Sequence, residues 1–185
     1  MDGVKCLACP AGTYNEFPDM TNVSDCIACS TNSVSPQGSS NRTNCMCNIG
    51  YTSSGPGLCI ACVRGTYKDI AGTAACTLCP FESLSPDAAT NLNNCTCNPG
   101  YTGPDGSSCE ACPAGFYKDV AGHFNCTQCP TFSSSPPGSR NLSMCACSPG
   151  YTGPLGGPCE ECPEDTYKEL VRIPSCCSPA RADEA

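Results

Sequence analysis

Cysteine is the residue with which this chain could do most chemistry, because 22 of its 185 residues are Cys. Thiols at this density form disulfides in an oxidising compartment and bind metal in a reducing one. The spacing of a four-thiolate zinc site is approached by Cys59, Cys62, Cys76 and Cys79. Zinc would leave the Cys-x-Cys pairs without partners, so we expect disulfides and neither a metal nor another cofactor.

Catalysis has little support, because acid-base or nucleophilic chemistry needs a positioned base. The only histidine, His123, occupies a repeat position that is filled elsewhere by Thr73 and Ile173, so we predict a loop residue and no enzyme. A cluster of acidic residues lacks the alternating oxygen ligands of a calcium loop, and we interpret it as a solvated face. The cluster comprises Glu160, Glu161, Glu164 and Asp165.

Composition excludes an ordinary hydrophobic core. Leu, Ile, Val and Phe together number 24, while Gly and Pro number 18 each. Disulfides must therefore take the place of apolar burial, which indicates an extracellular protein, secreted or at the cell surface. The net charge of −8 disfavours nucleic acid, and no apolar run is long enough to insert into a membrane. No signal-peptide pattern opens the sequence, so we expect a mature form or a fragment.

The cysteines recur with a period of 50 residues, which indicates tandem repeats. Cys59, Cys109 and Cys159 mark equivalent positions, and each repeat contains Cys-x2-Cys, Cys-x2-Cys and Cys-x-Cys. We divide the chain into residues 1–58 (repeat 1), 59–108 (repeat 2), 109–158 (repeat 3), 159–177 (a partial repeat 4) and 178–185 (a mobile tail).

Local signals predict short β-hairpins and turns without a helix of useful length. Asn98-Pro99-Gly100-Tyr101 is typical of a type II turn, with Pro second and Gly third. The Ser-Pro stretches at 33–40, 83–89 and 133–139 predict exposed loops. All seven tyrosines occupy two repeat positions, and we assign both to small cores that cover disulfides. The fold class expected is small and disulfide-rich, with tandem cysteine-rich repeats of short β-hairpins that form an elongated rod.

The repeat resembles a known family at the level of its motif. Residues 112–122 read Cys-Pro-Ala-Gly-Phe-Tyr-Lys-Asp-Val-Ala-Gly, followed by Cys126-x2-Cys129, a Ser-Pro loop, Cys-x-Cys and Pro-Gly-Tyr-Thr-Gly. This pattern is similar to the ephrin-receptor-like cysteine-rich repeat, which also occurs beside sushi and EGF modules. Its parts resemble tumour-necrosis-factor-receptor and EGF modules. The resemblance implies a disulfide-stapled extracellular protein but names no ligand.

Two disulfide schemes remain open. In the sequential scheme, Cys9 pairs with Cys26, Cys29 with Cys45, and Cys47 with Cys59, and this order repeats along the chain. In a crossed alternative, which resembles the receptor-type module, Cys29 pairs with Cys47 and Cys45 with Cys59. Either scheme uses Cys9, Cys26, Cys29, Cys45, Cys47, Cys59, Cys62, Cys76, Cys79, Cys95, Cys97, Cys109, Cys112, Cys126, Cys129, Cys145, Cys147, Cys159, Cys162 and Cys176.

Five Asn-x-Ser/Thr sequons predict covalent N-glycans. Asn22, Asn41 and Asn141 lie in expected loops and are the stronger candidates. Asn94 and Asn125 have cysteine as the middle residue, and early disulfide formation could hide them.

Two functional classes follow. The first is a structural rod protein, a subunit of a glycosylated filament or stalk that assembles head to tail with itself, with Cys6 and Cys177 left for an interchain bridge. The alternative is a ligand-binding ectodomain fragment of a cell-surface receptor or adhesion protein, whose partner is another extracellular protein. We favour the filament here, because every Tyr has a structural role and no exposed apolar or aromatic anchor is evident.

Overall fold

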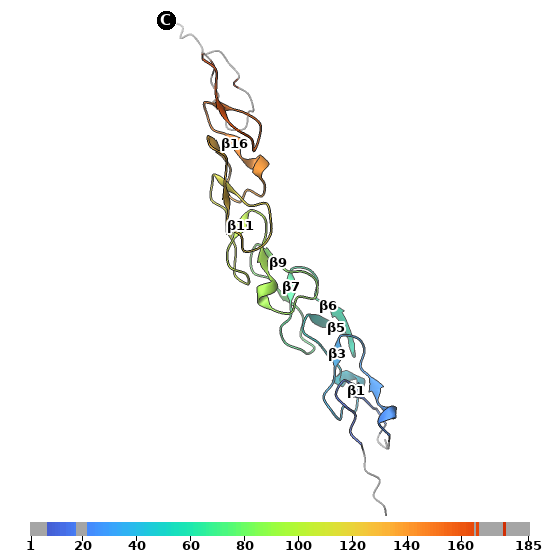
Figure 1. The fold of residues 1–185 in the computed structure, drawn as a ribbon. Coiled ribbons are helices and arrows are strands. Elements are labelled where there is room, and N and C mark those ends of the chain that lie inside the picture. Colours follow the sequence, from blue (N-terminus) through green and yellow to red (C-terminus); the bar gives the residue numbers. More distant parts are fainter. Residues whose placement is uncertain (1–6, 18–21, 165, 167–175, 177–185) are drawn as a thin grey trace, which may run out of the picture. The chain divides into compact units, whose positions relative to one another are not determined.

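The computed structural model describes residues 7–17, 22–164, 166 and 176. Much of the partial repeat 4 and all of the tail lie outside the described residues. Within the described part every sheet is a hairpin of two short strands, and the only helices are single 3-10 turns (Figure 1). The predicted fold class, a small disulfide-rich chain of tandem hairpin repeats, is confirmed. The elongated rod stays a prediction.

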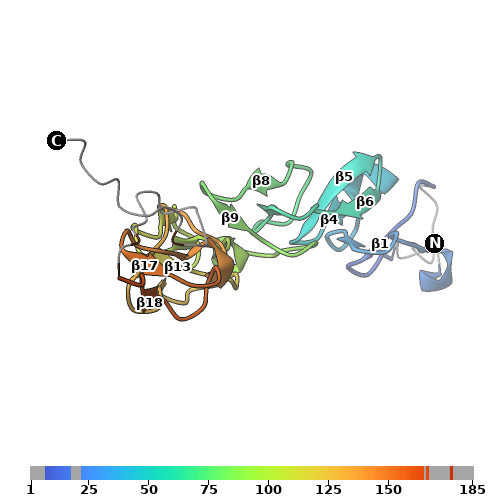
Figure 2. The ribbon, with the colours of Figure 1, turned by 90° about the horizontal axis from the view of Figure 1, so that it is seen from above.

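The hairpins recur in the same order in each repeat. Among the described residues, eight strand pairs have two residues on each side, and β5–β6 is the longest antiparallel hairpin (Figure 2). The pairs are β1 (Thr13–Tyr14) with β2 (Ile27–Ala28), β3 (Ser33–Val34) with β4 (Met46–Cys47), β5 (Tyr51–Gly55) with β6 (Leu58–Ala61), β7 (Thr66–Tyr67) with β8 (Thr77–Leu78), β9 (Ser83–Leu84) with β10 (Thr96–Cys97), β11 (Tyr101–Thr102) with β12 (Glu110–Ala111), β13 (Phe116–Tyr117) with β14 (Thr127–Gln128), β15 (Ser133–Ser134) with β16 (Ala146–Cys147), and β17 (Tyr151–Thr152) with β18 (Glu160–Glu161). The 3-10 turns are η1 (Val23–Asp25), η2 (Arg42–Asn44), η3 (Leu92–Asn94) and η4 (Leu142–Met144).

The chain divides into two compact units. Unit 1 comprises Met1–Cys79 and Leu84–Cys95, and unit 2 comprises Pro80–Ser83 and Thr96–Ala185. Hairpins β1–β2 through β7–β8 belong to unit 1, and β11–β12 through β17–β18 belong to unit 2. The same local motif therefore builds both units.

Ten disulfides pair the cysteines sequentially rather than in the crossed scheme. Their Cα–Cα distances run from 5.5 to 5.8 Å, and each closes a loop in which the two cysteines are 12 to 17 positions apart. The pairs are Cys9–Cys26, Cys29–Cys45, Cys47–Cys59, Cys62–Cys76, Cys79–Cys95, Cys97–Cys109, Cys112–Cys126, Cys129–Cys145, Cys147–Cys159 and Cys162–Cys176.

Sulfur forms the core of these repeats. Among the described residues, 11 of the 14 buried side chains classed as hydrophobic are cysteines; the others are Tyr14, Ala89 and Ala146. No Leu, Ile, Val, Phe or Met in the described part is buried. Apolar burial therefore contributes little beyond the disulfides themselves.

The predicted type II turns form as the glycines require. Gly50 and Gly100 have φ of +78° and +85°, and the N–H of the following tyrosine donates to the residue three positions before it. A Cβ at either glycine would lie 2.4 Å from a backbone oxygen of the adjacent loop. Glycine is therefore required both for the positive φ and for the close approach.

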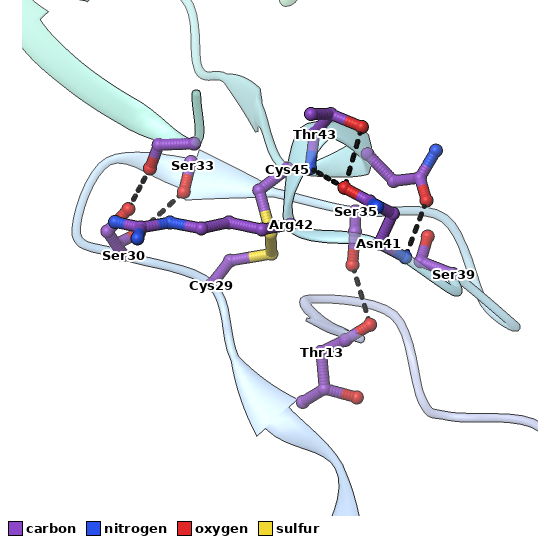
Figure 3. Close-up of a disulfide and its surroundings, with 12 residues drawn as sticks. Thr13, Cys29, Ser30, Ser33, Ser35, Ser39, Asn41, Arg42, Thr43 and Cys45 are labelled. Carbon is purple, nitrogen blue, oxygen red and sulfur yellow. Dashed lines mark hydrogen bonds between the residues drawn. A yellow bond between two sulfur atoms is a disulfide. The ribbon is translucent and has the colours of Figure 1, made fainter. Parts of the chain in front are cut away.

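The prediction that the Ser-Pro stretches are exposed loops was correct only in part: the proline of each stretch is exposed, but the serine before it is buried. Ser35, Ser85 and Ser135 are 2 to 5% exposed, and their hydroxyls donate over 2.8 Å to backbone carbonyls of the first loop of the same repeat. Figure 3 shows the first of these bonds, from Ser35 to the Thr13 oxygen. The stretches fold inward because the small serines satisfy carbonyls that would otherwise be buried without a partner.

Reduction should abolish this fold, whereas heating or protease treatment of the oxidised chain should have little effect. Each loop is worth about 3 kcal/mol in the chain-entropy model, and no buried aliphatic cluster remains to replace the bridges. Circular dichroism and limited proteolysis before and after reduction and alkylation test this prediction. Survival of protease resistance after full reduction would contradict it.

Candidate functional site

Two buried lysines connect the β5–β6 and β11–β12 hairpins, which begin with the Gly-Tyr-Thr motif, to the loops that follow them. Lys68 is 4% exposed, and its Nζ donates to the carbonyl oxygens of Tyr51, over 2.7 Å, and of Gly72. Lys118 is 2% exposed and repeats the arrangement with Tyr101 and Gly122. These ammonium groups are structural donors, and the sequence analysis did not identify them. The recurrence of lysine at one repeat position was the sequence signal that could have indicated this structural role.

The electrostatics of the lysines follow from their burial. Desolvation lowers the pKa of Lys68 below its ordinary value. Desolvation also lowers the pKa of Lys118, and the nearby negative charge of Asp105 partly opposes this effect. Both side chains are withdrawn from solvent, so within the described residues the only exposed cations are Arg42, Arg64 and Arg140.

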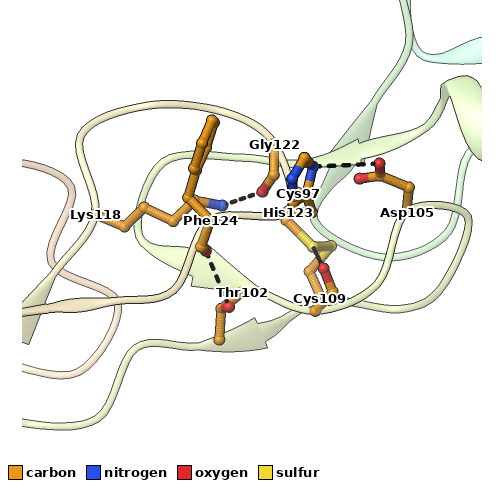
Figure 4. A network of polar contacts seen from close by, with 9 residues as sticks. Cys97, Thr102, Asp105, Cys109, Lys118, Gly122, His123 and Phe124 are labelled. Carbon is orange, nitrogen blue, oxygen red and sulfur yellow. Dashed lines mark hydrogen bonds and ion pairs between the residues drawn. A yellow bond between two sulfur atoms is a disulfide. The ribbon is translucent and has the colours of Figure 1, made fainter.

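Asp105, Lys118 and His123 form a polar cluster in unit 2 (Figure 4). His123 Nδ1 lies 3.7 Å from Asp105 Oδ2, and the imidazole stacks on Phe124 with ring centroids 5.1 Å apart. The His123 side chain is 71% exposed. The structure thus places this histidine on the surface of a loop beside one carboxylate.

The expectation that no apolar anchor is exposed was wrong. Phe17, Ile70 and Val120 occupy one repeat position, eight residues after the first cysteine of the first loop, and they are 75%, 73% and 50% exposed. They lie outside because each repeat buries sulfur and serine in its interior and has no room for a large aliphatic side chain. We call this position the first-loop tip.

Unit 2 also contains two open cavities near the β15–β16 hairpin. One has a volume of about 510 Å³, and its wall includes Ser134, Met144 and Leu155. The other has a volume of about 460 Å³ and is lined by Pro130, Thr131, Phe132, Gly156, Gly157, Pro158 and Cys159. We call the second cavity the Phe132 pocket.

Phe132 has an unusual conformation for a bulky residue. Its φ is +61°, and its ring, 51% exposed, stacks face to face on Tyr151 with centroids 4.3 Å apart and an interplanar angle of 5°. The equivalent positions in repeats 1 and 2 hold Asn32 and Glu82, also with positive φ. Sequence reasoning missed Phe132, because nothing in its local pattern shows that the backbone there is left-handed.

The sequons lie in different local environments. Asn22, Asn41 and Asn141 are exposed N-caps of 3-10 turns, and the hydroxyls of Thr43 and Ser143 donate to the Oδ1 atoms of Asn41 and Asn141. Figure 3 shows Asn41 and Thr43 beside the Cys29–Cys45 bridge.

The two sequons with a middle cysteine differ from each other. Asn94 is half-buried, and its Oδ1 accepts from the N–H groups of Thr90 and Asn91, while Asn125 is exposed. Glycan attachment at all five positions stays a prediction.

Other candidates from the sequence are placed as follows. The four cysteines of the zinc alternative belong to three separate disulfides, Cys47–Cys59, Cys62–Cys76 and Cys79–Cys95. Of the acidic cluster, Glu160, Glu161 and Glu164 are exposed, and Asp165 lies outside the described residues, as do Cys6 and Cys177. In the described part no three His, Cys, Asp or Glu side chains are grouped so as to hold a metal ion.

Comparison with known families agrees with this architecture. The family described as tyrosine-protein kinase ephrin type A/B receptor-like matches residues 50–95 and 100–145. Each matched segment contains the type II turn glycine, a buried lysine and two complete disulfides. This is an ephrin-receptor-like cysteine-rich repeat protein.

Curated relatives of these repeats are much longer proteins. The sushi, von Willebrand factor type A, EGF and pentraxin domain-containing protein 1 of Mus musculus is 40% identical over 52 residues, and that of Rattus norvegicus is 42% identical over 52 residues. The match covers 28% of this chain and 2% of each relative. The family and the disulfide density together indicate an extracellular or cell-surface setting. In the described residues no helix is long and apolar enough to cross a membrane.

Replacing a buried lysine should loosen one repeat junction without breaking a bridge. Lys118→Met leaves the Tyr101 and Gly122 carbonyls without their donor, and we expect a loss of about 1–3 kcal/mol in unfolding free energy. Urea denaturation with disulfides intact measures this loss. Arg140→Met, at an exposed cation, is the control and should change stability by less than about 0.5 kcal/mol.

The sign of the pH dependence follows from the lowered pKa. Between the folded and unfolded pKa values of Lys118, the unfolded chain binds more protons than the folded one. The stability of the wild type should therefore rise with pH, relative to Lys118→Met, as pH increases through this alkaline window. The opposite slope would show that Lys118 is not desolvated.

Proposed function

We propose that this chain is a non-catalytic, ligand-binding segment of a larger secreted or cell-surface protein. The disulfide ladder holds short loops in fixed positions, and these loops present side chains to a protein partner. Relatives that contain a similar segment are named for several extracellular domain types, which supports a role as one module among many. The ligand-binding alternative therefore replaces the filament as our preferred hypothesis.

The observation that carries this proposal is the exposure of the first-loop tips. Binding energy at protein interfaces comes mostly from a few apolar or aromatic anchors that become desolvated on contact. Phe17, Ile70 and Val120 are such side chains, and the bridges Cys9–Cys26, Cys62–Cys76 and Cys112–Cys126 close their loops. A rigid loop loses little entropy on binding, so even a modest apolar contact gives useful affinity.

The filament hypothesis depended on the absence of such anchors, and that premise does not hold. Its proposed interchain bridge involves Cys6 and Cys177, which lie outside the described residues. No contact in the described part favours a homopolymer over a heterologous partner. The filament is therefore the alternative hypothesis, and electron microscopy distinguishes it from the ligand-binding proposal.

Replacing the apolar side chains at the first-loop tips with serine should weaken partner binding while leaving the fold intact. An Fc fusion of the chain is applied to an array of secreted and cell-surface proteins, and the hit is tested with Phe17→Ser/Ile70→Ser/Val120→Ser. We expect at least a tenfold loss of affinity, on the order of 1.4 kcal/mol or more. Leu78→Ser, also highly exposed but outside the tips, is the control and should bind as the wild type does.

Negative-stain microscopy of the chain without the Fc fusion distinguishes the filament hypothesis from the ligand-binding proposal. Monodisperse particles are expected. Long fibres formed equally by the wild type and the triple variant, with no hit on the array, would replace the ligand-binding proposal with the filament.

N-glycans are proposed at the exposed N-cap sequons Asn22, Asn41 and Asn141. Asn91 is the repeat-2 equivalent of Asn41 and Asn141 but lacks an acceptor hydroxyl two residues later, where Asn93 stands. Asn93→Thr completes the triplet, and because this N-cap is exposed we expect one additional glycan. Peptide mapping after enzymatic deglycosylation in H₂¹⁸O counts the occupied sites. Absence of glycan from both Asn41 and Asn141 after secretion from eukaryotic cells would contradict the assignment.

A further inference from the structure

The Phe132 pocket and the β17–β18 hairpin, whose loop lines it, differ from their counterparts earlier in the chain at two positions. The first is position 132, where Phe replaces Asn32 and Glu82. The second is position 161, where Glu replaces Ala61 and Ala111. Since the repeats share one backbone pattern, the equivalent positions of the other repeats show the same local structure without the two replacements.

The two replaced side chains converge through Tyr151. Phe132 stacks on Tyr151, and Tyr151 lies directly opposite Glu161 in the β17–β18 register. Directly opposed residues of an antiparallel pair project to the same face of the hairpin, with Cβ atoms about 4.5–5.5 Å apart. The side chain of Glu161 therefore projects from the same face of the hairpin as that of Tyr151, two positions after Cys159, the last residue that lines the pocket.

One wall of the pocket beside this aromatic pair is a loop that contains two glycines. Gly156, Gly157 and Pro158 line it opposite the segment 130–132. A Cβ at Gly156 would lie 2.7 Å from the Leu142 carbonyl oxygen, and one at Gly157 would lie 2.4 Å from Pro154 Cγ. A side chain at either glycine would therefore clash, so glycine at these two positions permits the close packing of this loop beside the pocket, whose volume is about 460 Å³.

The charge of unit 2 as a whole, and of the two residues that follow the pocket wall, favours a cationic occupant. Among the described residues of unit 2, seven are acidic, namely Glu82, Asp105, Glu110, Asp119, Glu160, Glu161 and Glu164, against Arg140 and the buried Lys118. Glu160 and Glu161 are both exposed and directly follow the Pro158–Cys159 wall. An aromatic face next to a carboxylate attracts a cation, and it disfavours an anion.

We propose that the Phe132 pocket binds an arginine side chain of an extracellular protein partner. A planar guanidinium stacks on an aromatic ring and at the same time donates hydrogen bonds to a carboxylate, which a compact ammonium does less well. Phe132 supplies the ring, Tyr151 supports it from behind, and Glu161 accepts from the guanidinium. The proposal rests on the ligand-binding function proposed above and names the chemistry of one contact.

The test uses the full isotope-labelled chain and the peptide acetyl-Gly-Arg-Gly-amide as the probe. We expect saturable NMR shifts at Phe132, Gly156, Gly157 and Glu161, and weaker binding in high salt because the contact is ionic. The matched citrulline peptide has the same shape without the charge and should produce no saturable shift. The lysine peptide should bind more weakly than the arginine peptide.

Two variants restore the sister-repeat residues and so should fold. Phe132→Asn introduces a side chain that tolerates positive φ, and Glu161→Ala reproduces the Ala that faces Tyr101 in the β11–β12 hairpin. Each should lower affinity for the arginine peptide about fivefold or more. Glu110→Gln, at the position of β12 that is equivalent to Glu160 in β18, is the control and should leave affinity unchanged.

Equal binding of the citrulline peptide, unchanged affinity in Phe132→Asn, stronger binding of the lysine peptide, or no saturable shift with any peptide would each overturn the arginine assignment. Its failure is separable from that of the proposed function. If a protein hit binds the Phe132→Asn variant as well as it binds the wild type, the proposed ligand-binding function is supported and the arginine pocket is contradicted. If the arginine peptide binds but no protein on the array does, the pocket is supported and the proposed ligand-binding function is contradicted.

Discussion

Covalent closure of short loops is the constraint on which every other feature of this protein depends. A chain of 185 residues with 24 large aliphatic and Phe side chains cannot offset its conformational entropy by apolar burial. Ten local bridges reduce the entropy of the unfolded chain instead, and the sulfur atoms also fill the interior. Side chains that a larger domain would bury, such as Ile70 and Leu78, are therefore free to lie on the surface.

The interior between the bridges is polar, and it is organised by hydrogen bonds to backbone carbonyls. Two-residue strands satisfy few of these groups, so side-chain donors must reach the remainder. Ser85 and Lys68 both do so in repeat 2, one with a small hydroxyl and the other with a long buried ammonium. Such fully partnered polar groups fix the loop conformation more narrowly than aliphatic contacts of the same area could.

The repeat period, the hairpins, the type II turns and the family resemblance could be predicted because each is determined by local spacing or by the needs of a single glycine. The inward-facing serines were mispredicted, because Ser-Pro composition describes an average loop and says nothing of a carbonyl from another segment. Lys118 was overlooked for the same reason, since its partners lie 17 and 4 residues away on a path set by the bridges. The exposure of Phe17 follows from an interior already full of sulfur, which hydropathy alone does not reveal.

The candidate site was harder to predict than the fold. Stacking of Phe132 on Tyr151 depends on a left-handed backbone residue that in the other repeats is polar, so the pattern of one repeat could not show it. Comparison among repeats within one chain shows it readily once the backbone is known. A repeated scaffold of this kind lets one copy change its surface while the others keep the original arrangement.

The short span of every bridge also bears on how the chain acquires its structure during secretion. In each of the ten pairs, the two cysteines are at most 17 positions apart in the sequence. A ribosome-bound chain could therefore complete each bridge soon after that loop enters the oxidising lumen, before later repeats are synthesised. Low contact order of this kind favours fast, vectorial folding, and it limits the number of unpaired thiols available for mispairing at any moment.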